Sequence, residues 1–474
     1  MRKTLKNFQR KFLVCQKSFR FLSILLFGFF IAMILAVTTY AADPNGKDTY
    51  AKDPSTAVNI AWTLITGFLV FLMQAGFALL GGGIGLKNMT NYLTKSYIDF
   101  TVAGLVFFLV GFAIMFGGSG LAPGLDAGNN YIGYSGFALL GSSYDVSTVA
   151  LWFFQMVFAA TAATIVAGCV IGRLKFRAYL LYTVVVSAII YTIYGHWVWG
   201  GGWLADLGAV DFAGSGVVHA VGGFVGLAAT LLLGPRIGKF RRDGKPNSFP
   251  SHNITYVVLG TFILFFGWFG FNPGSTLAAT QLRIAVIAVT TFLAGAAGAV
   301  TVLLIEYYKH QKANIISICN GSLAGLVAIT APSAYVAPWA AVVIGVVAGI
   351  LYLVGVWFFD YITKIDDPIG AISVHGINGL WGLISVGIFA DGTYGVAGLI
   401  VGNTRQIIVQ LVSAFVVFVW AFGMGLILFK IIDMLIGLRV SKEEELEGLD
   451  IEEHGLPAYP EFVVSKATRQ SQEE

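Results

Sequence analysis

Apolar residues along this chain gather in long blocks. Runs of about 20 apolar residues recur from one end to the other, and each is long enough to cross a hydrocarbon layer of about 30 Å as a helix. Short connections rich in glycine or charge separate the runs. The pattern predicts an all-α polytopic membrane protein with eleven transmembrane helices, near 57–80, 98–119, 148–172, 178–198, 211–234, 252–272, 281–305, 313–331, 336–359, 369–390 and 405–436.

Composition supports this fold class. The 474 residues are 57% hydrophobic and 11% charged, whereas soluble domains average about 25% charged residues. The net charge of +4 gives no indication of nucleic-acid binding, because the basic residues lie in short clusters between the spans. Cys15, Cys169 and Cys319 have neither paired nor metal-ligand spacing, so we expect no disulfide framework.

The N-terminus has the pattern of a long secretory signal peptide. Residues 1–20 carry seven Lys or Arg residues, residues 21–36 are apolar, and small residues follow near Ala41 and Ala42. We expect cleavage there, with residues 1–42 removed. The alternative is a retained extra span.

Charge in the connections orients the spans. The odd connections are basic, as in RLKFR and GPRIGKFRRDGK, whereas the even connections are nearly free of lysine and arginine. The positive-inside rule then puts the mature N-terminus outside. The organisation expected is a transmembrane domain at 56–436 in the cell inner (plasma) membrane and a cytoplasmic regulatory tail at 437–474.

Two segments of the chain repeat one another. Residues 211–226 read DFAGSGVVHAVGGFVG and residues 367–382 read DPIGAISVHGINGLWG, so both fit D-x-x-G-x-x-x-V-H-x-x-x-G-x-x-G. Asp211 begins its span at the outer face and Asp367 begins its span at the inner face. We therefore expect two inverted five-helix repeats plus a long eleventh helix, a common transporter plan in which the site lies near the midplane. Eight helical residues rise about 12 Å, which puts both His219 and His375 near the centre.

Both membrane histidines are candidates for function. A lone buried histidine is often a core residue hydrogen-bonded to a neighbouring helix. Two at equivalent repeat positions favour a functional reading, because burying ionisable groups in a membrane is costly. Paired imidazoles can line a narrow path with one donor and one acceptor each, and can relay protons near neutral pH. The flanking glycines permit close helix packing.

A histidine pair also serves as the axial ligands of haem, which would make this chain a membrane redox protein. Haem needs a wide slot between helices, and the glycine-rich flanks favour tight packing instead. Zinc is disfavoured because no third ligand follows at suitable spacing. We expect no metal or cofactor and no enzymatic activity.

Aromatic residues gather on the side that carries Asp211. Trp199 precedes it in the outer connection GHWVWGGGW. The segment LWFFQMVFAA begins at the same face, and the segment FFGWFGFNPGS ends there. Many such residues form the interfacial aromatic belt of membrane proteins. Aromatic faces also attract cations. A cup of them with one hydroxyl acceptor, Ser275, suits a small cation that donates hydrogen bonds, as ammonium does and K⁺ does not.

These motifs resemble the ammonium transporter family (Amt/Mep/Rh), and the bacterial and archaeal Amt proteins in particular. The matching segments are MQAGFALL, WGGGWL, DFAGSGVVH, GWFGFNPGS and DDPIGAISVHGINGLWG, with the tail GLRVSKEEELEGLDIEEHG. They occur in order, at family spacing, over about 56–460. The resemblance implies eleven helices around one pore in each subunit of a homotrimer.

The resemblance also implies residue roles. Trp199, Phe158 and Ser275 would form the external recruitment site for ammonium, and Phe158 and Phe271 would stack as a gate below it. His219 and His375 would line a narrow hydrophobic pore. Asp211 would be the buried outer aspartate that supports substrate binding, by orienting backbone groups and not by touching the ion.

The remaining implications concern transport mode and partners. Ammonium would lose its proton at the gate, and ammonia would cross while the proton moves separately. The alternatives are an electroneutral Rh-type ammonia channel and an ammonium sensor. The tail would pack under the neighbouring subunit, and a PII-type signal protein is the partner expected in the cytoplasm. Gly81, Leu86 and Pro273 depart from the family pattern near the inner face and the recruitment site.

Overall fold

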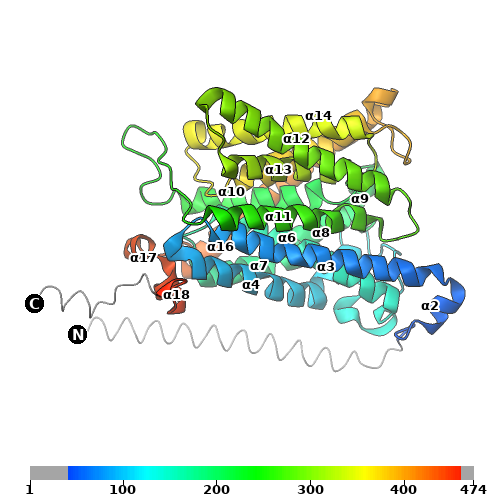
Figure 1. Ribbon diagram of the computed structural model, residues 1–474. Coiled ribbons are helices and arrows are strands. Elements are labelled where there is room, and N and C mark those ends of the chain that lie inside the picture. Colours follow the sequence, from blue (N-terminus) through cyan, green and yellow to red (C-terminus); the bar gives the residue numbers. More distant parts are fainter. Residues whose placement is uncertain (1–40, 461–474) are drawn as a thin grey trace, which may run out of the picture.

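The computed structural model describes residues 41–460 as a bundle of helices running between two opposite ends of the molecule (Figure 1). The helices α17 (Lys442–Glu447) and α18 (Leu449–His454) lie at one end, which we call the tail face. The helix α2 (Lys47–Lys52) lies at the opposite end, the α2 face. The predicted signal peptide, residues 1–42, falls outside the described residues apart from its last two positions.

Among residues 41–460, ten helical segments are long and apolar enough to cross a membrane. Several contain a short segment of π or 3₁₀ helix in addition to α-helix. Their helices are α3 (Ser55–Gly82), α4 (Met89–Val106), α5 (Phe112–Phe116), α6 (Val146–Cys169), α7 (Phe176–Val185), α8 (Tyr191–Trp199), α9 (Trp203–Leu207), α10 (Val221–Leu233), α11 (Ile254–Phe271), α12 (Ile284–His310), α14 (Pro338–Trp357), α15 (Asn378–Phe389) and α16 (Thr404–Ile436).

Two of the predicted spans differ from the structure. The span expected at 313–331 is α13 (Ile315–Thr330), an apolar helix of 16 residues that is buried along most of its length. The span expected to begin at residue 98 begins at Met89, because Asn91 and Lys95 are buried with polar partners from the tail. Charged or polar positions with such partners do not mark the end of a helix.

Glycines allow the helices to approach closely, as expected for helix pairs in membranes. A Cβ atom on Gly76 of α3 would lie 2.9 Å from the Gly260 carbonyl oxygen of α11, and one on Gly260 would lie 2.6 Å from the Gly76 carbonyl oxygen. Any larger residue at either position would push these two helices apart.

The tail is fixed to the tail face of its own chain by carboxylates that accept backbone N–H groups. The Asp450 carboxylate accepts the Asn91 amide of α4 at 2.8 Å, and the Glu453 carboxylate accepts the Phe176 amide of α7 at 2.8 Å. Free N–H groups at helix N-termini favour negative charge. Arg439 adds an ion pair with Glu445 at 2.8 Å. The tail thus caps two transmembrane segments.

Candidate functional site

The two predicted histidines lie in short π-helical segments at the centre of the bundle. His219 belongs to η7 (Ser215–Ala220), which leads into α10, and His375 belongs to η10 (Ile372–Ile377), which leads into α15. Such π segments are rare and often mark functional sites. Both imidazoles are almost completely buried.

The two imidazole rings face each other directly. Their Nδ1 atoms are 3.2 Å apart, and the rings stack with centroids 5.2 Å apart and an interplanar angle of 22°. One ring must donate the shared hydrogen and the other must accept it. In a neutral pair, one of the two Nε2 atoms is therefore a donor and the other an acceptor. His219 Nε2 has no protein partner among the described residues.

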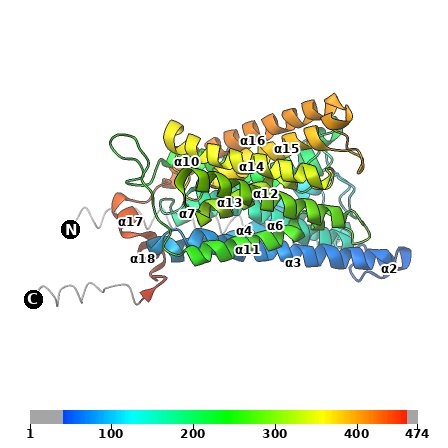
Figure 2. The ribbon, with the colours of Figure 1, turned by 45° about the horizontal axis from the view of Figure 1, so that its top comes forward.

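Each histidine segment begins at a carboxylate that caps it. Asp211 accepts four backbone N–H groups, from Gly214 and Ser215 at one oxygen and from Gly216 and Val217 at the other, at 2.8 to 2.9 Å. Asp367 accepts three of the four corresponding amides, those of Ala371, Ile372 and Ser373, at 2.8 to 3.4 Å. The segment after Asp211 starts beside α9, and the segment after Asp367 starts at the tail face, so the repeated sequence runs in opposite directions (Figures 1 and 2).

Glycines bring the two repeats together. A Cβ atom on Gly223 of α10 would clash with the Gly376 backbone beside His375, and one on Gly379 would lie 2.5 Å from the Ser215 carbonyl oxygen. The close packing expected from the sequence is therefore present at the histidine pair.

The predicted gate residues lie next to the histidines. The rings of Phe158 and Phe271 stack with centroids 4.1 Å apart and an interplanar angle of 33°, and both are fully buried. Phe271 also stacks on His219, with centroids 5.3 Å apart. The space between the predicted gate and the histidines is thus filled by a continuous run of packed rings.

The predicted recruitment residues lie beyond the gate. The indole of Trp199 packs edge-on against Phe158, with centroids 6.2 Å apart, and its Nε1 donates to the Asp211 backbone oxygen at 2.7 Å. Ser275 donates its hydroxyl hydrogen to the Phe271 backbone oxygen at 2.8 Å. Its oxygen lone pairs therefore remain free to accept hydrogen bonds. Trp199 and Ser275 are half-buried, whereas the gate is closed from solvent.

Two aromatic residues of the site were missed by the sequence reasoning. Trp268 stacks on His219 with centroids 5.2 Å apart, and its Nε1 donates to Thr330 at 2.9 Å. Phe77 lies beside His375, with ring centroids 6.4 Å apart. Trp268 stands one helical turn before Phe271 in the motif GWFGFNPGS, which was the available signal. Phe77 belongs to the motif MQAGFALL, but nothing in that motif indicated a contact with His375.

The geometry excludes the bis-histidine haem alternative. Two axial ligands of haem have the porphyrin plane between them, whereas here the imidazoles stack and share a direct hydrogen bond. Within residues 41–460, no group of three or more histidine, cysteine, aspartate or glutamate side chains comes together as a metal site.

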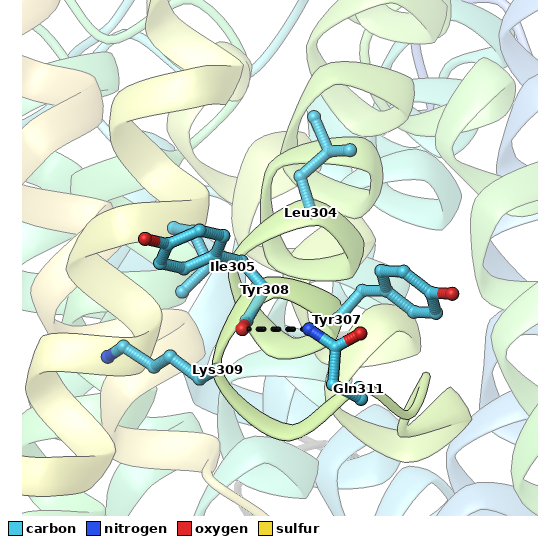
Figure 3. Close-up of a pocket in the computed structure, with 6 residues that line it drawn as sticks. All are labelled: Leu304, Ile305, Tyr307, Tyr308, Lys309 and Gln311. Atoms are coloured by element: carbon cyan, nitrogen blue, oxygen red, sulfur yellow. Dashed lines mark hydrogen bonds between the residues drawn. The ribbon is translucent and has the colours of Figure 1, made fainter.

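Two hollows lie outside this run of rings. One of about 680 Å³ lies on the end of α12 and is lined by Leu304, Ile305, Tyr307, Tyr308, Lys309 and Gln311 (Figure 3). The other, of about 420 Å³, opens at the tail face, and Asp367, Asn320 and Tyr352 are among its lining residues. Only the second adjoins a histidine segment, and it is therefore the candidate exit.

A buried ion pair fixes the connection beside this exit. Arg236 binds the Asp366 carboxylate with two guanidinium nitrogens, at 2.7 and 2.8 Å. Burial acts to raise the pKa of Asp366, but the hydrogen bonds and charge of Arg236, with the charge of Arg173, outweigh it and lower the pKa to about 2. The carboxylate therefore stays ionised at neutral pH.

The departures from the family pattern have local explanations in two cases. The ring of Tyr92 fills the space that a side chain at Gly81 would need. Pro273 opens the 3₁₀ turn η8 (Pro273–Thr276), where its fixed φ angle fits the first helical position. Leu86 is exposed, and nothing in the structure explains its presence.

Comparison with known proteins identifies the family. The family model described as the Ammonium Transporter Family matches residues 61–459. The chain is 52% identical over 457 residues to ammonium transporter Amt2 of Archaeoglobus fulgidus, covering 92% of this chain and 95% of that protein. It is 36% identical over 418 residues to ammonium transporter 3 of Dictyostelium discoideum, covering 85% and 94%.

Solved structures agree with this family. A structure described as a sensor Amt protein superposes with a TM-score of 0.79 at 38% identity, covering 85% of this chain and 100% of that one. Mep2 from Candida albicans superposes with a TM-score of 0.75 at 29% identity, covering 86% and 92%. Matched over most of its length in both sequence and structure, the chain belongs to the ammonium transporter family.

Proposed function

We propose that this protein carries ammonium nitrogen across the membrane through the run of rings that begins at Trp199 and ends at His375. The observation that carries the proposal is the order of the groups: a half-buried aromatic cup, a buried phenyl pair, and two stacked imidazoles. Its relatives are transporters and not enzymes. The α2 face would be outside the cell inner (plasma) membrane, and the tail face would be in the cytoplasm.

Recruitment would take place at Trp199, Phe158 and Ser275. Desolvated aromatic rings attract a cation, and the free lone pairs of Ser275 would accept one ammonium N–H. Asp211 cannot bind the ion directly, because four amides occupy both of its oxygens. It would hold the turn that positions Trp199, whose indole donates to its backbone oxygen.

Ammonia and the proton would separate at the gate. An ion carried past Phe158 and Phe271 would lose its remaining hydration in an apolar passage, which is costly for a charge and cheap for neutral ammonia. The proton would enter at the acceptor Nε2 of the histidine pair, shift the hydrogen between the two Nδ1 atoms, and leave from the other Nε2. K⁺ has no proton to release and would be excluded.

Membrane assembly is proposed on two further observations. Large apolar side chains are exposed along α11 and α12, including Phe262, Phe266 and Phe292, and would face lipid or the other subunits of a homotrimer. The tail packs at the face where a PII-type signal protein would bind. Chemical cross-linking of the purified protein tests the trimer. We expect the largest cross-linked species to be a trimer, and a largest species of dimer size contradicts the proposal.

Current measurements test the transport proposal. Proteoliposomes on a solid-supported membrane receive an ammonium pulse, and the decay of the current is recorded at several lipid-to-protein ratios. Transport predicts that the decay time changes with the ratio, because vesicles fill at a rate set by protein density. A decay that stays fixed indicates binding without transport, as in a sensor, and ammonia flux without current indicates an electroneutral channel.

A further inference from the structure

A second buried acid lies away from the pore. Asp99 of α4 is completely buried between α4, α6 and α7. Its carboxyl group contacts the Thr164 hydroxyl of α6 at 2.6 Å and the Thr183 hydroxyl of α7 at 2.7 Å. The Tyr179 hydroxyl of α7 is a third neighbour able to hydrogen-bond to it. It contacts neither histidine nor any recruitment or gate residue. An ionisable group buried in a membrane span is costly and calls for a partner or a function.

Lys95, the cationic residue nearest to Asp99 along α4, already pairs with a carboxylate of the tail. Lys95 precedes Asp99 by one helical turn, but its Nζ donates to the Leu174 backbone oxygen at 2.7 Å and lies 3.8 Å from a Glu453 carboxylate oxygen of α18. Within residues 41–460, no ion pair joins Lys95 to Asp99. The positive charge is therefore turned toward the tail face.

The other titratable groups around Asp99 supply no positive charge. They are Tyr92 on α4, Cys169 on α6, and Tyr179 and Tyr182 on α7. The part of α3 that faces the cluster contributes Gln74, which is uncharged. An ionised Asp99 would thus be a buried negative charge without a cationic partner.

The hydrogen bonds accommodate one additional hydrogen. The Thr164 hydroxyl has one hydrogen but lies within bonding distance of three oxygens that can accept it: Asp99 Oδ2 at 2.6 Å, Ala160 O at 2.8 Å and Gln74 Oε1 at 3.0 Å. A neutral Asp99 would donate to Thr164, whose own hydrogen would then go to Ala160 or Gln74. Thr183 would still donate to the other Asp99 oxygen, as Tyr179 can, so Asp99 keeps its hydrogen bonds when it is neutral.

We propose that Asp99 is a proton-binding site separate from the pore, occupied while Glu453 of the docked tail holds Lys95. When the tail leaves, Lys95 loses Glu453 and can pair with Asp99, since positions four apart lie on one helix face. The Asp99 O–H bond then breaks, the proton passes to solvent, and the lysine charge replaces it. Asp99 therefore binds a proton while the tail is docked and pairs with the Lys95 ammonium group while the tail is undocked.

Infrared spectroscopy of the full chain in lipid vesicles tests the site. A protonated carboxyl group has a C=O band that a carboxylate lacks. We expect Asp99→Asn to lose one such band at pH 5, while Asp145→Asn, which alters a carboxyl group that accepts one amide at the N-terminus of α6, keeps it. If Asp99→Asn loses no acid band, Asp99 is ionised and the proposal is overturned. If that variant does not fold, Asp99→Glu serves, because it keeps the acid and must shift the band.

The link to the tail is tested by two further variants. Glu453→Gln frees Lys95 and is expected to lose the Asp99 band, whereas Glu453→Gln combined with Lys95→Met is expected to restore it. A band that survives in the single variant overturns the exchange with Lys95. A final control exchanges the buffer cation from choline to Na⁺. We expect the Asp99 acid band of the wild type to stay unchanged. Loss of this band in Na⁺ would mean that the Asp99 oxygens bind a metal cation and not a proton, which would overturn the proposal.

Discussion

Replacing Asp211 with asparagine tests how the outer turn is held. The two carboxylate oxygens accept two backbone N–H groups each, at 2.8 to 2.9 Å, in a position that is 4% exposed. Asparagine has the same shape, but one oxygen becomes an NH₂ group that cannot accept. Two buried amides therefore lose their acceptor whichever way the side chain turns.

The cost follows from this count. A buried donor left without an acceptor costs about 1–3 kcal/mol, so two cost about 2–6 kcal/mol. Because Trp199 donates to the Asp211 backbone oxygen, a displaced turn also displaces the indole of the cup. We expect the variant to melt at a lower temperature and to lose most of its ammonium-driven current.

The assay pairs thermal melting of the purified protein with solid-supported membrane current. Asp145→Asn is the matched control, because Asp145 is also buried and caps a helix but accepts only the Ser147 amide. Asparagine keeps one accepting oxygen for this amide, and Asn and Asp are comparable N-cap residues, so we expect near-normal stability and normal current. An Asp211→Asn protein that melts and transports as the wild type does would refute the reasoning.

Three further predictions concern other groups. Replacing His219 or His375 with leucine should abolish the ammonium-driven current or its discrimination against K⁺, measured in proteoliposomes; unchanged currents and selectivity contradict the proton relay. Ser275→Ala should weaken apparent ammonium affinity about tenfold, since a hydrogen bond to a charged group contributes about 1.5–3 kcal/mol and this one is partly solvated; an unchanged concentration dependence counts against the recruitment role. Asp366 has a pKa of about 2 in the folded protein and of about 4 when unfolded, so its stabilisation is present above pH 4 and lost as the pH falls toward 2. The melting temperature of the wild type should therefore fall between pH 4 and pH 2, and Asp366→Asn should lack this part of the fall. The variant also leaves Arg236 unpaired, so its melting temperature at pH 7 should be lower.

The membrane fold and the central site were predictable because they rest on local sequence. Apolar block length predicts spans, and the repeated D…VH…G pattern carries the carboxylate cap, the histidine and the glycines of both π segments. The same repeat predicted that His219 and His375 both lie near the centre, and the structure shows their rings face to face. Sequence periodicity could not indicate the π kinks themselves, because they shift the register by one residue within an otherwise ordinary helix.

The errors arose where partners come from distant parts of the chain. The second span begins before Asn91 and Lys95 because Asp450 and Glu453, some 360 positions later, supply their partners. A hydropathy pattern treats Lys95 as unfavourable in a membrane span, because it does not take the distant Glu453 carboxylate into account. Phe77 was missed for the same reason, since its place beside His375 depends on how α3 packs against the second repeat.

The two repeats share a cap but differ in the side chains around it, and in the proposed mechanism this difference would give the site its direction. Beside Asp211 the chain adds Trp199, Phe158 and Ser275, which suit a cation. Beside Asp367 it adds an open hollow lined by Asn320 and Tyr352, without a closed aromatic pair. A hydrogen-bonded histidine pair can pass a proton in either direction. The direction of recruitment must therefore come from the side chains that the repeat does not duplicate.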